Sequence, residues 1–523
     1  MTHLPWLSFL VYFPLAAAIV VALLPAGSAR TARITATVAA LAELLLSLPL
    51  WWKLVPSRPG FQFEESLDWL PAIGARYHLG VDGVSALLAL LTTFTTFVAV
   101  LGAWTAVEKR AREFYALLLA LEAGMLGTFF CLDLLLFYVF WEAMLVPMYL
   151  LIGVWGGQRR VYAAVKFFLY TMAGSVLMLV AILSLWLTHK AMGGPPTFDL
   201  TAFYDMPLTP SHQLWLFLAF AFAFAIKVPM FPLHTWLPDA HVEAPTAGSV
   251  VLAAVLLKMG TYGFVRFAMP LFPSALEVCG PWIAALALVG IVYGALVAMV
   301  QPDLKKLVAY SSVSHMGFAM LGLMALNAQG MAGSMMTMLN HGVSTGALFL
   351  LVGVVYERRH TRLISDFGGL WKVIPVYSAI FLVVMLSSIG LPGTNGFIGE
   401  FLVILGAFRH QIPWAVIAAT GVILSACYML WMFQRVVFGP VTHDENRRLS
   451  DLSLREKLVF APLLVLIFWM GFAPQPILDR VQPSLDRTLA ITQLRAARTA
   501  ALYPPVPEGL RLPGTPRPSG AAR

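Results

Sequence analysis

The sequence predicts an all-α protein that crosses a membrane many times. Hydrophobic residues make up 59% of the 523 residues, charged residues make up 11%, and the mean hydropathy is +0.81. Soluble domains contain about 25% charged residues. Apolar stretches of span length, about 20 residues each, also follow one another with short gaps. This pattern favours one polytopic membrane bundle over several soluble domains.

The apolar stretches give about fourteen expected spans. Their centres lie near Val20, Leu44, Leu91, Gly124, Met144, Leu177, Phe220, Lys258, Val292, His315, Val343, Ile389, Cys427 and Ile467. If both termini face outward, the loops after odd-numbered spans carry 19 Lys and Arg residues, and those after even-numbered spans carry 6. An excess in the inward loops is the positive-inside pattern. Residues 1–24 lack a basic n-region, so we interpret them as the first span rather than a signal peptide.

Two of the expected spans are interrupted by proline. One break follows residues 226–229 (Ile-Lys-Val-Pro) and the other lies at residues 389–392 (Ile-Gly-Leu-Pro). Proline removes a backbone donor, and broken helices at membrane depth line ion paths in transporters. The breaks fall five spans apart, which predicts two inverted five-helix repeats, spans 4–8 and 9–13, with discontinuous spans 7 and 12. The alternative is a chance recurrence of two Pro-interrupted helices.

The expected repeats divide the chain into five segments. Residues 1–110 hold spans 1–3, residues 111–270 the first repeat, residues 271–440 the inverted second repeat, residues 441–478 span 14, and residues 479–523 a basic tail rich in Pro and Gly. We expect this tail to be partly disordered, mainly past Ala501.

Ionisable side chains recur inside the expected spans. They are Glu142, Lys227, Lys258, His315, His341 and Glu400, with Glu122 as a secondary candidate and Glu43 as a further buried acid. Each costs about 2.5–3.5 kcal/mol at a helix centre. A proton relay needs acids, bases and imidazoles at one depth, because each group must take up and release a proton in turn.

We hypothesise that Glu142 and Lys227 form an ion pair that opens and closes. Lys258 and the imidazoles would then carry the proton across, and Glu400 would exchange it on the far side. The alternative for each residue is a structural ion pair or hydrogen bond between helices, and for Glu43 this alternative is the better one.

Other patterns argue against metal, cofactor and nucleic-acid sites. We interpret the cluster of His234, Asp239 and His241 as a polar connector between spans 7 and 8. The three cysteines lie far apart without Cys-x-x-Cys spacing, which argues against an iron–sulfur site or a disulfide framework. The net charge of +8 resides in loops and the tail, so it does not indicate nucleic-acid binding.

Several of these segments resemble a known family. Residues 227–258, which begin Lys-Val-Pro-Met-Phe-Pro and end Leu-Leu-Lys, resemble the antiporter-like subunits of respiratory complex I. So do residues 140–142 (Phe-Trp-Glu) and residues 303–317, which begin Asp-Leu-Lys-Lys. The resemblance covers about residues 81–439, and the superfamily includes Mrp-type sodium/proton antiporters and membrane hydrogenases. Residues 391–401 look most like the M branch, the counterpart of mitochondrial NADH dehydrogenase subunit 4, because Glu400 stands where the L and N branches usually have Lys.

The resemblance implies a proton-translocating subunit of NADH:quinone oxidoreductase in the bacterial inner membrane, with no redox chemistry in this chain. The family's Glu of helix 5, Lys of helices 7 and 8 and His of helix 11 fall on Glu142, Lys227, Lys258 and His341. NADH, FMN, iron–sulfur clusters and quinone are then expected in partner subunits. The expected neighbours are the L and N antiporter-like subunits, the lateral helix of L, which this chain lacks, and the lipid bilayer.

Other functions remain as alternatives. An Mrp-type or hydrogenase-associated cation/proton antiporter subunit is the nearest. A haem- or quinone-binding redox subunit is disfavoured, because His315 and His341 are only two histidines on adjacent spans and no Gly-x-Gly-x-x-Gly opens a βαβ unit. A non-conducting spacer would leave the buried charges unexplained.

Overall fold

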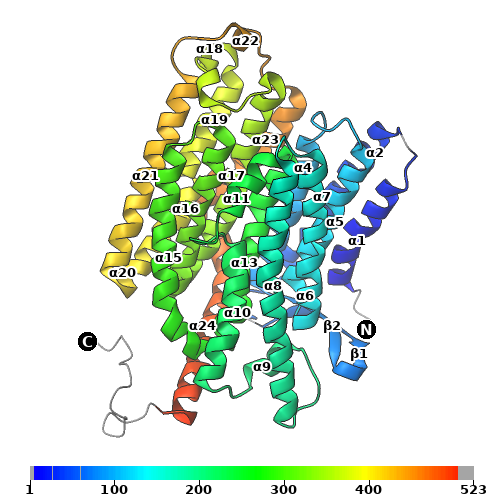
Figure 1. The fold of residues 1–523 in the computed structure, drawn as a ribbon, viewed down its shortest axis with the longest axis vertical. Helices are drawn as coiled ribbons and strands as arrows, with labels where there is room; N and C mark the ends of the chain where they lie inside the picture. The colour runs from blue at the N-terminus through cyan, green and yellow to red at the C-terminus, as the bar shows by residue number, and fades with distance from the viewer. Residues whose placement is uncertain (1–4, 26, 59, 505–523) are drawn as a thin grey trace.

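Helices make up most of the protein in the computed structural model, which describes residues 5–25, 27–58 and 60–504 (Figure 1). The long helices run side by side along the long axis of the molecule. Within the described residues the sheet structure is a single two-stranded hairpin. It lies at the lower right of the view, beside the N-terminal end of α1.

The elements follow in this order. The N-terminal part contains α1 (Trp6–Ala22), α2 (Ala29–Ser47), α3 (Pro49–Lys53), β1 (Gln62–Leu70), η1 (Pro71–Ile73), β2 (Ala75–Val81) and α4 (Gly83–Gly102). Next come α5 (Ala111–Phe130), α6 (Leu134–Ala143), α7 (Leu145–Trp155), α8 (Arg160–Ala191), α9 (Leu200–Tyr204), α10 (Pro210–Lys227), α11 (Trp236–Glu243), α12 (Thr246–Val251), η2 (Leu252–Leu256), α13 (Leu257–Gly263), η3 (Phe264–Ala268) and α14 (Met269–Leu271). The rest comprises α15 (Pro273–Met299), α16 (Leu304–Met324), α17 (Ala328–Arg359), η4 (Ile364–Asp366), α18 (Leu370–Val373), α19 (Pro375–Ser388), α20 (Asn395–His410), α21 (Ile412–Val437), α22 (Asp444–Arg447), α23 (Leu454–Phe472) and α24 (Gln475–Leu502).

The number of membrane-length helices confirms a polytopic all-α fold. In the part of the chain that the structure describes, ten helices are long and apolar enough to cross a membrane, or eleven if α23 and α24, which meet at 72°, form one span. Two shorter apolar helices, α1 and α19, accompany them. The expected fourteen crossings and the inverted repeat stay predictions.

The core of the bundle is formed by α17 and by the helix that runs from α12 to α14. The most apolar part of each is wholly buried inside the protein, as expected for helices that are apolar on all sides. The α12–α14 helix contains two π-helical turns, η2 and η3, on either side of α13. Such turns occur mostly as single insertions in α-helices and often at functional sites. Lys258 is the second residue of α13, so the first of these turns, η2, ends two residues before it.

The break predicted near Pro229 is present. The helix α10 ends at Lys227, and turns lead from there to α11. Ending a helix leaves carbonyl groups without intrahelical partners. The indole nitrogen of Trp236 donates to one of them, the carbonyl of Ile226, at 2.9 Å. Trp236 therefore ties the two sides of the break together.

The second predicted break is also present, between α19 and α20. Gly390 and Gly393 lie in it with φ of +76° and +90°, a left-handed conformation that glycine adopts without steric cost. A Cβ at Gly396, in the first turn of α20, would lie 1.9 Å from the carbonyl oxygen of Ser387. Glycine at this position thus lets the two half-helices approach closely.

The hairpin is held to the helices by a histidine–carboxylate contact. His78 of β2 lies 2.6 Å from Asp199 and 3.4 Å from Glu64. Burial lowers the pKa of His78, but the hydrogen bonds and negative charges of Asp199 and Glu64 outweigh it, and the pKa is raised. Burial acts to raise the pKa of Asp199, and hydrogen bonds from His78 and Thr201 bring it below its usual value.

A buried ion pair lies where the hairpin leads into α4. The Arg266 guanidinium lies 2.6 Å from Asp82, and both side chains are 4% exposed. Arg266 also donates to Ser85 at 3.1 Å and to Tyr262 at 3.2 Å. The contact joins the start of α4 to the end of the α12–α14 helix.

Much of the expected C-terminal tail is helical. Residues 479–502 belong to α24, and Arg495 ties this helix to its neighbours. Its guanidinium donates to the carbonyls of Phe203, Met206 and Leu271, at 2.9–3.3 Å. These bonds satisfy carbonyl groups near the ends of α9 and α14. The disorder expected further on falls partly on residues 505–523, which lie outside the described residues.

Candidate functional site

Four of the predicted relay residues meet in the core of the bundle. Lys258 Nζ lies 2.6 Å from His341 Nδ1, and His315 Nδ1 lies 2.8 Å from Glu400 Oε1. The rings of His341 and His315 are 5.9 Å apart between centroids. Each of the four residues is at most 5% exposed. The helices α13, α17, α16 and α20 thus align a base, two imidazoles and an acid in one row.

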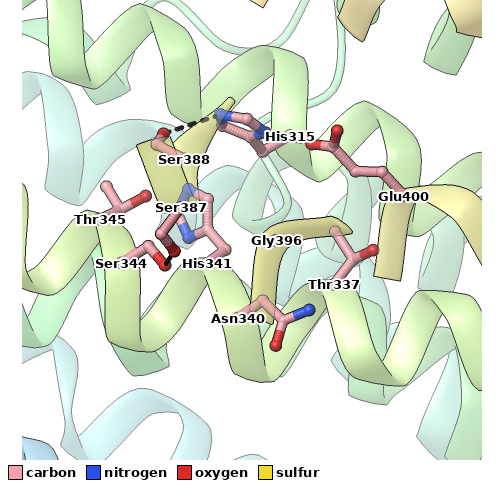
Figure 2. Close-up of a pocket in the computed structure, with 10 residues that line it drawn as sticks. All are labelled: His315, Thr337, Asn340, His341, Ser344, Thr345, Ser387, Ser388, Gly396 and Glu400. Atoms are coloured by element: carbon pink, nitrogen blue, oxygen red, sulfur yellow. Dashed lines mark hydrogen bonds and ion pairs between the residues drawn. The ribbon is translucent and has the colours of Figure 1, made fainter. Parts of the chain in front are cut away.

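A small polar cavity bridges the gap between the two histidines (Figure 2). Its volume is about 20 Å³, and a cavity of about 10–15 Å³ is large enough for one water molecule. Figure 2 shows His315 between Ser388 and Glu400, with His341 facing the same space. His341 Nε2 and Glu400 Oε2 have no hydrogen-bond partner among the described residues. The cavity therefore offers polar groups that a water could join.

Amide and hydroxyl groups fix the walls of this cavity. Asn340 donates to the carbonyl of Asn395 at 2.6 Å, and the hydroxyls of Ser344 and Ser387 lie 2.7 Å apart. Ser344 and Ser387 also donate to the side-chain oxygen of Asn395. Asn395 begins α20 just after the break. The break thus presents polar groups to the row of titratable side chains. Asn340, Ser344 and Ser387 were not singled out from the sequence, although they are polar residues within apolar spans.

The predicted ion pair between Glu142 and Lys227 is not formed in this structure. Among the described residues, neither Lys227 Nζ nor Glu142 Oε1 has a hydrogen-bond partner. Lys227 Nζ instead lies 5.1 Å from the centroid of the Trp141 ring and 5.9 Å from that of Phe167. Cation–π attraction operates at such distances. The two charges are near enough to interact electrostatically, but they are not in contact.

Glu122 and Glu43 lie apart from the row. Both side chains are fully buried, and neither carboxyl has a hydrogen-bond partner among the described residues. Glu43 comes from α2 and Glu122 from α5, and the two carboxyls interact electrostatically with each other. The structure therefore places the secondary candidate with Glu43 rather than with His315 or Glu400.

His241 is a residue whose position the sequence did not reveal. We expected a polar connector, yet its imidazole is fully buried and stacks on Phe349 with centroids 4.5 Å apart. It interacts electrostatically with both Lys258 and Lys305. Lys305 donates to the carbonyl of Ala244 at 2.5 Å. His241 thus extends the row of titratable groups beyond Lys258.

A polar cavity lies at that end of the row. It has a volume of about 120 Å³, and its lining includes Lys305, Glu243 and Arg362. The volume is enough for several water molecules. The other two connector residues behave differently: Asp239 pairs with Lys166 at 2.7 Å, and the His234 ring packs against Phe231. Within the described residues, His, Cys, Asp and Glu side chains form no group able to hold a metal ion.

Known proteins with the same organisation identify the family. The family described as "NADH:quinone oxidoreductase/Mrp antiporter, TM" matches residues 131–425. NADH-quinone oxidoreductase subunit M of Rhodobacter capsulatus is 48% identical over 494 residues, covering 92% of this chain and 95% of that protein. NADH-ubiquinone oxidoreductase chain 4 of Arabidopsis thaliana is 44% identical, covering 92% and 96%. A chain of respiratory complex I from Thermus thermophilus with bound NADH has a TM-score of 0.84 at 35% identity, covering 94% and 99%.

This chain therefore belongs to the NADH:quinone oxidoreductase/Mrp antiporter family of membrane proteins. Within that family its curated relatives are subunit M of NADH-quinone oxidoreductase and its counterpart, chain 4. The resemblance read from residues 227–258 and 391–401 is confirmed.

Proposed function

We propose that this chain is the proton-translocating M-type subunit in the membrane arm of a respiratory complex I. The observation that carries the proposal is the buried row Lys258, His341, His315 and Glu400, with a water-sized cavity between the two histidines. Each group can accept and release a proton. Hydrogen bonds and one water suffice to link them, so a proton can cross the core without a continuous open pore.

The proton enters the row from the polar cavity beside Lys305 and leaves by way of Glu400. His241 receives it from the side of Lys305 and passes it to Lys258. Glu142 and Lys227 act as a gate: the present arrangement, with Lys227 over the Trp141 ring, is its open state. Closing the pair would place the Glu142 carboxylate against Lys227 and change the electrostatic potential at Lys258.

The finer architecture belongs to the same proposal. We count fourteen crossings by adding α1, α10, the broken α19–α20 pair and α23 to the ten membrane-length helices. Two inverted five-helix units then each contain one broken helix. The Lys and Arg excess in alternate loops supports termini on the outer face of a bacterial inner membrane. The identity of 48% to a subunit M over 95% of its length supports L and N subunits as neighbours, with the redox cofactors in partner subunits.

The test is a Lys258→Met variant of the assembled complex in sealed membrane vesicles. Methionine keeps the unbranched shape of lysine and removes the ammonium group. Quinone reduction by NADH and acidification of the vesicle lumen are measured together. We expect both to fall at least about 100-fold if the group is an obligatory proton carrier. The matched control is Lys372→Met, because Lys372 is exposed on α18. Normal coupled pumping in Lys258→Met vesicles with an intact complex would refute the relay.

The second candidate is an independent cation/proton antiporter of the Mrp type, because the family description includes Mrp antiporters as well as NADH:quinone oxidoreductase. The same vesicles distinguish it. Proton movement that requires sodium and persists without NADH would favour the antiporter, whereas movement that requires NADH and no sodium favours the complex I subunit.

A further inference from the structure

An apolar groove opens between α2, α3, α4, α17, α23 and α24, away from the proton relay. Its volume is about 300 Å³, and all of its lining residues are apolar or aromatic. Sites for small hydrophobic ligands in proteins measure about 300–1,000 Å³ and are lined mainly by such side chains. The groove is therefore large enough to take up an extended hydrocarbon segment rather than a water molecule.

The floor of the groove belongs to the core of the protein. Leu87 and Leu91 of α4 and Leu339 and Val343 of α17 are at most 6% exposed. The last two residues flank His341 at a distance of two residues on each side. Anything that fills the groove therefore packs directly against the helix segment that carries this relay histidine.

The mouth of the groove has the composition of a membrane interface. Trp51, Trp52 and Trp469 line it, and Trp52 is 68% exposed. Tryptophan is enriched where the hydrocarbon core of a bilayer meets its headgroups. The groove thus reaches from buried apolar helices to the level at which lipid headgroups lie.

The side chain of Arg480 places a positive charge at this mouth. The Arg480 guanidinium lies 3.7 Å from the centroid of the Trp51 ring, and its Nε donates to the Trp51 carbonyl at 3.0 Å. These contacts hold Arg480 in place. The nearby Lys53 is exposed, but its ammonium lies over the Trp6 ring, 5.9 Å from the centroid, so Arg480 is the cation that faces the groove. Basic side chains at the membrane surface attract anionic lipids. A neutral hydrocarbon ligand would gain nothing from this charge.

We propose that this groove binds an anionic phospholipid, with one acyl chain against α4 and α17 and the phosphate beside Arg480. The acyl chain fills the groove between the helices, which the surrounding bilayer lipids do not enter. The Arg480 guanidinium at the mouth selects for a negatively charged headgroup.

The experiment uses phosphatidylglycerol with a photoreactive diazirine at the acyl chain end, added to the purified assembled complex. Phosphatidylcholine with the same label is the neutral probe, and crosslinked peptides are identified by mass spectrometry. We expect phosphatidylglycerol to label the α4 and α17 segments that line the groove. Leu44→Trp and Leu90→Trp, two half-buried positions at its edge, should each reduce this labelling about tenfold by filling the space.

Headgroup recognition is tested with Arg480→Gln. We expect labelling by phosphatidylglycerol to fall about five-fold, which corresponds to one basic side chain at the membrane surface, while labelling by phosphatidylcholine stays low and unchanged. The matched control for the two tryptophan variants is Val289→Trp, which places the same side chain on the exposed face of α15 and should change nothing. Labelling that is absent from the groove in the wild type, equal for the two lipids, or unaffected by both tryptophans would overturn the proposal. The first of these results would mean that a neighbouring subunit covers the groove.

Discussion

Replacing Glu400 with glutamine removes one ionisable group from the proposed relay while keeping the size of the side chain. At the 2.8 Å separation between His315 Nδ1 and Glu400 Oε1, an imidazolium and a carboxylate attract by about 6 kcal/mol at an effective dielectric of about 20. A neutral hydrogen bond in the same place contributes about 1 kcal/mol. Glu400→Gln thus removes about 5 kcal/mol of stabilisation of the charged pair, or about three to four powers of ten in its population.

The assay is proton pumping by the assembled complex in vesicles, measured with NADH–quinone activity. A positioned proton donor or acceptor accelerates transfer by about 10²–10⁴-fold, so we expect a loss of pumping within that range. Glu400→Asp keeps the charge on a shorter side chain and should recover part of it. The control is Glu445→Gln, which changes an exposed glutamate whose carboxylate lies 3.8 Å from Arg359. Wild-type pumping and turnover in Glu400→Gln would show that the row of groups does not conduct protons.

Three further predictions concern the parts that hold the site. Gly396→Ala should lower stability by about 1–3 kcal/mol, because its Cβ would meet the Ser387 carbonyl at 1.9 Å. Gly346→Ala on α17 is the control, because the nearest atom to its added Cβ would be 3.8 Å away. Thermal unfolding in detergent should therefore show a lower melting temperature for Gly396→Ala than for Gly346→Ala. Asp82→Asn and Arg266→Met should each cost about 3–5 kcal/mol by leaving a buried charge alone, and the double variant should cost less than the sum in the same assay; additive losses would contradict this. The raised pKa of His78 means that its contact stabilises the hairpin fully below the usual histidine range and loses this effect as pH rises through the raised value. The lowered pKa of Asp199 means that its contribution is lost as acid conditions approach that value. The protection of the β2 amides against hydrogen exchange, taken relative to their intrinsic exchange rate at each pH, should therefore be greatest at mildly acidic pH, and a His78→Gln variant should show a flatter profile.

The sequence was informative where a buried charge is costly. Lys258, His341 and Glu400 stand out in apolar spans because each needs a compensating partner, and the structure brings all three into one row with His315. The proline and glycine breaks were also predictable, because these residues constrain or free the backbone at their own positions in the chain.

Other features depended on the path of the chain in three dimensions. His241 lies in a stretch rich in proline and polar residues, and only the folding of that connector into the core places it beside Lys258 and Lys305. The distance between Glu142 and Lys227 is set by the packing of two helices, which spacing along the chain does not determine. The order of α24 depends on Arg495 reaching carbonyls more than 200 residues away.

The π-helical turn before Lys258 gives the amine a fixed anchor. Lys258 Nζ donates to the carbonyl of Ala253 in η2 as well as contacting His341. In the proposed relay, the amine keeps this backbone partner when it passes a proton to the imidazole and need not swing to find a new one. The reorganisation that the proposed transfer requires then falls mainly on the imidazole. Lys258 would thus accept and release protons from one fixed position.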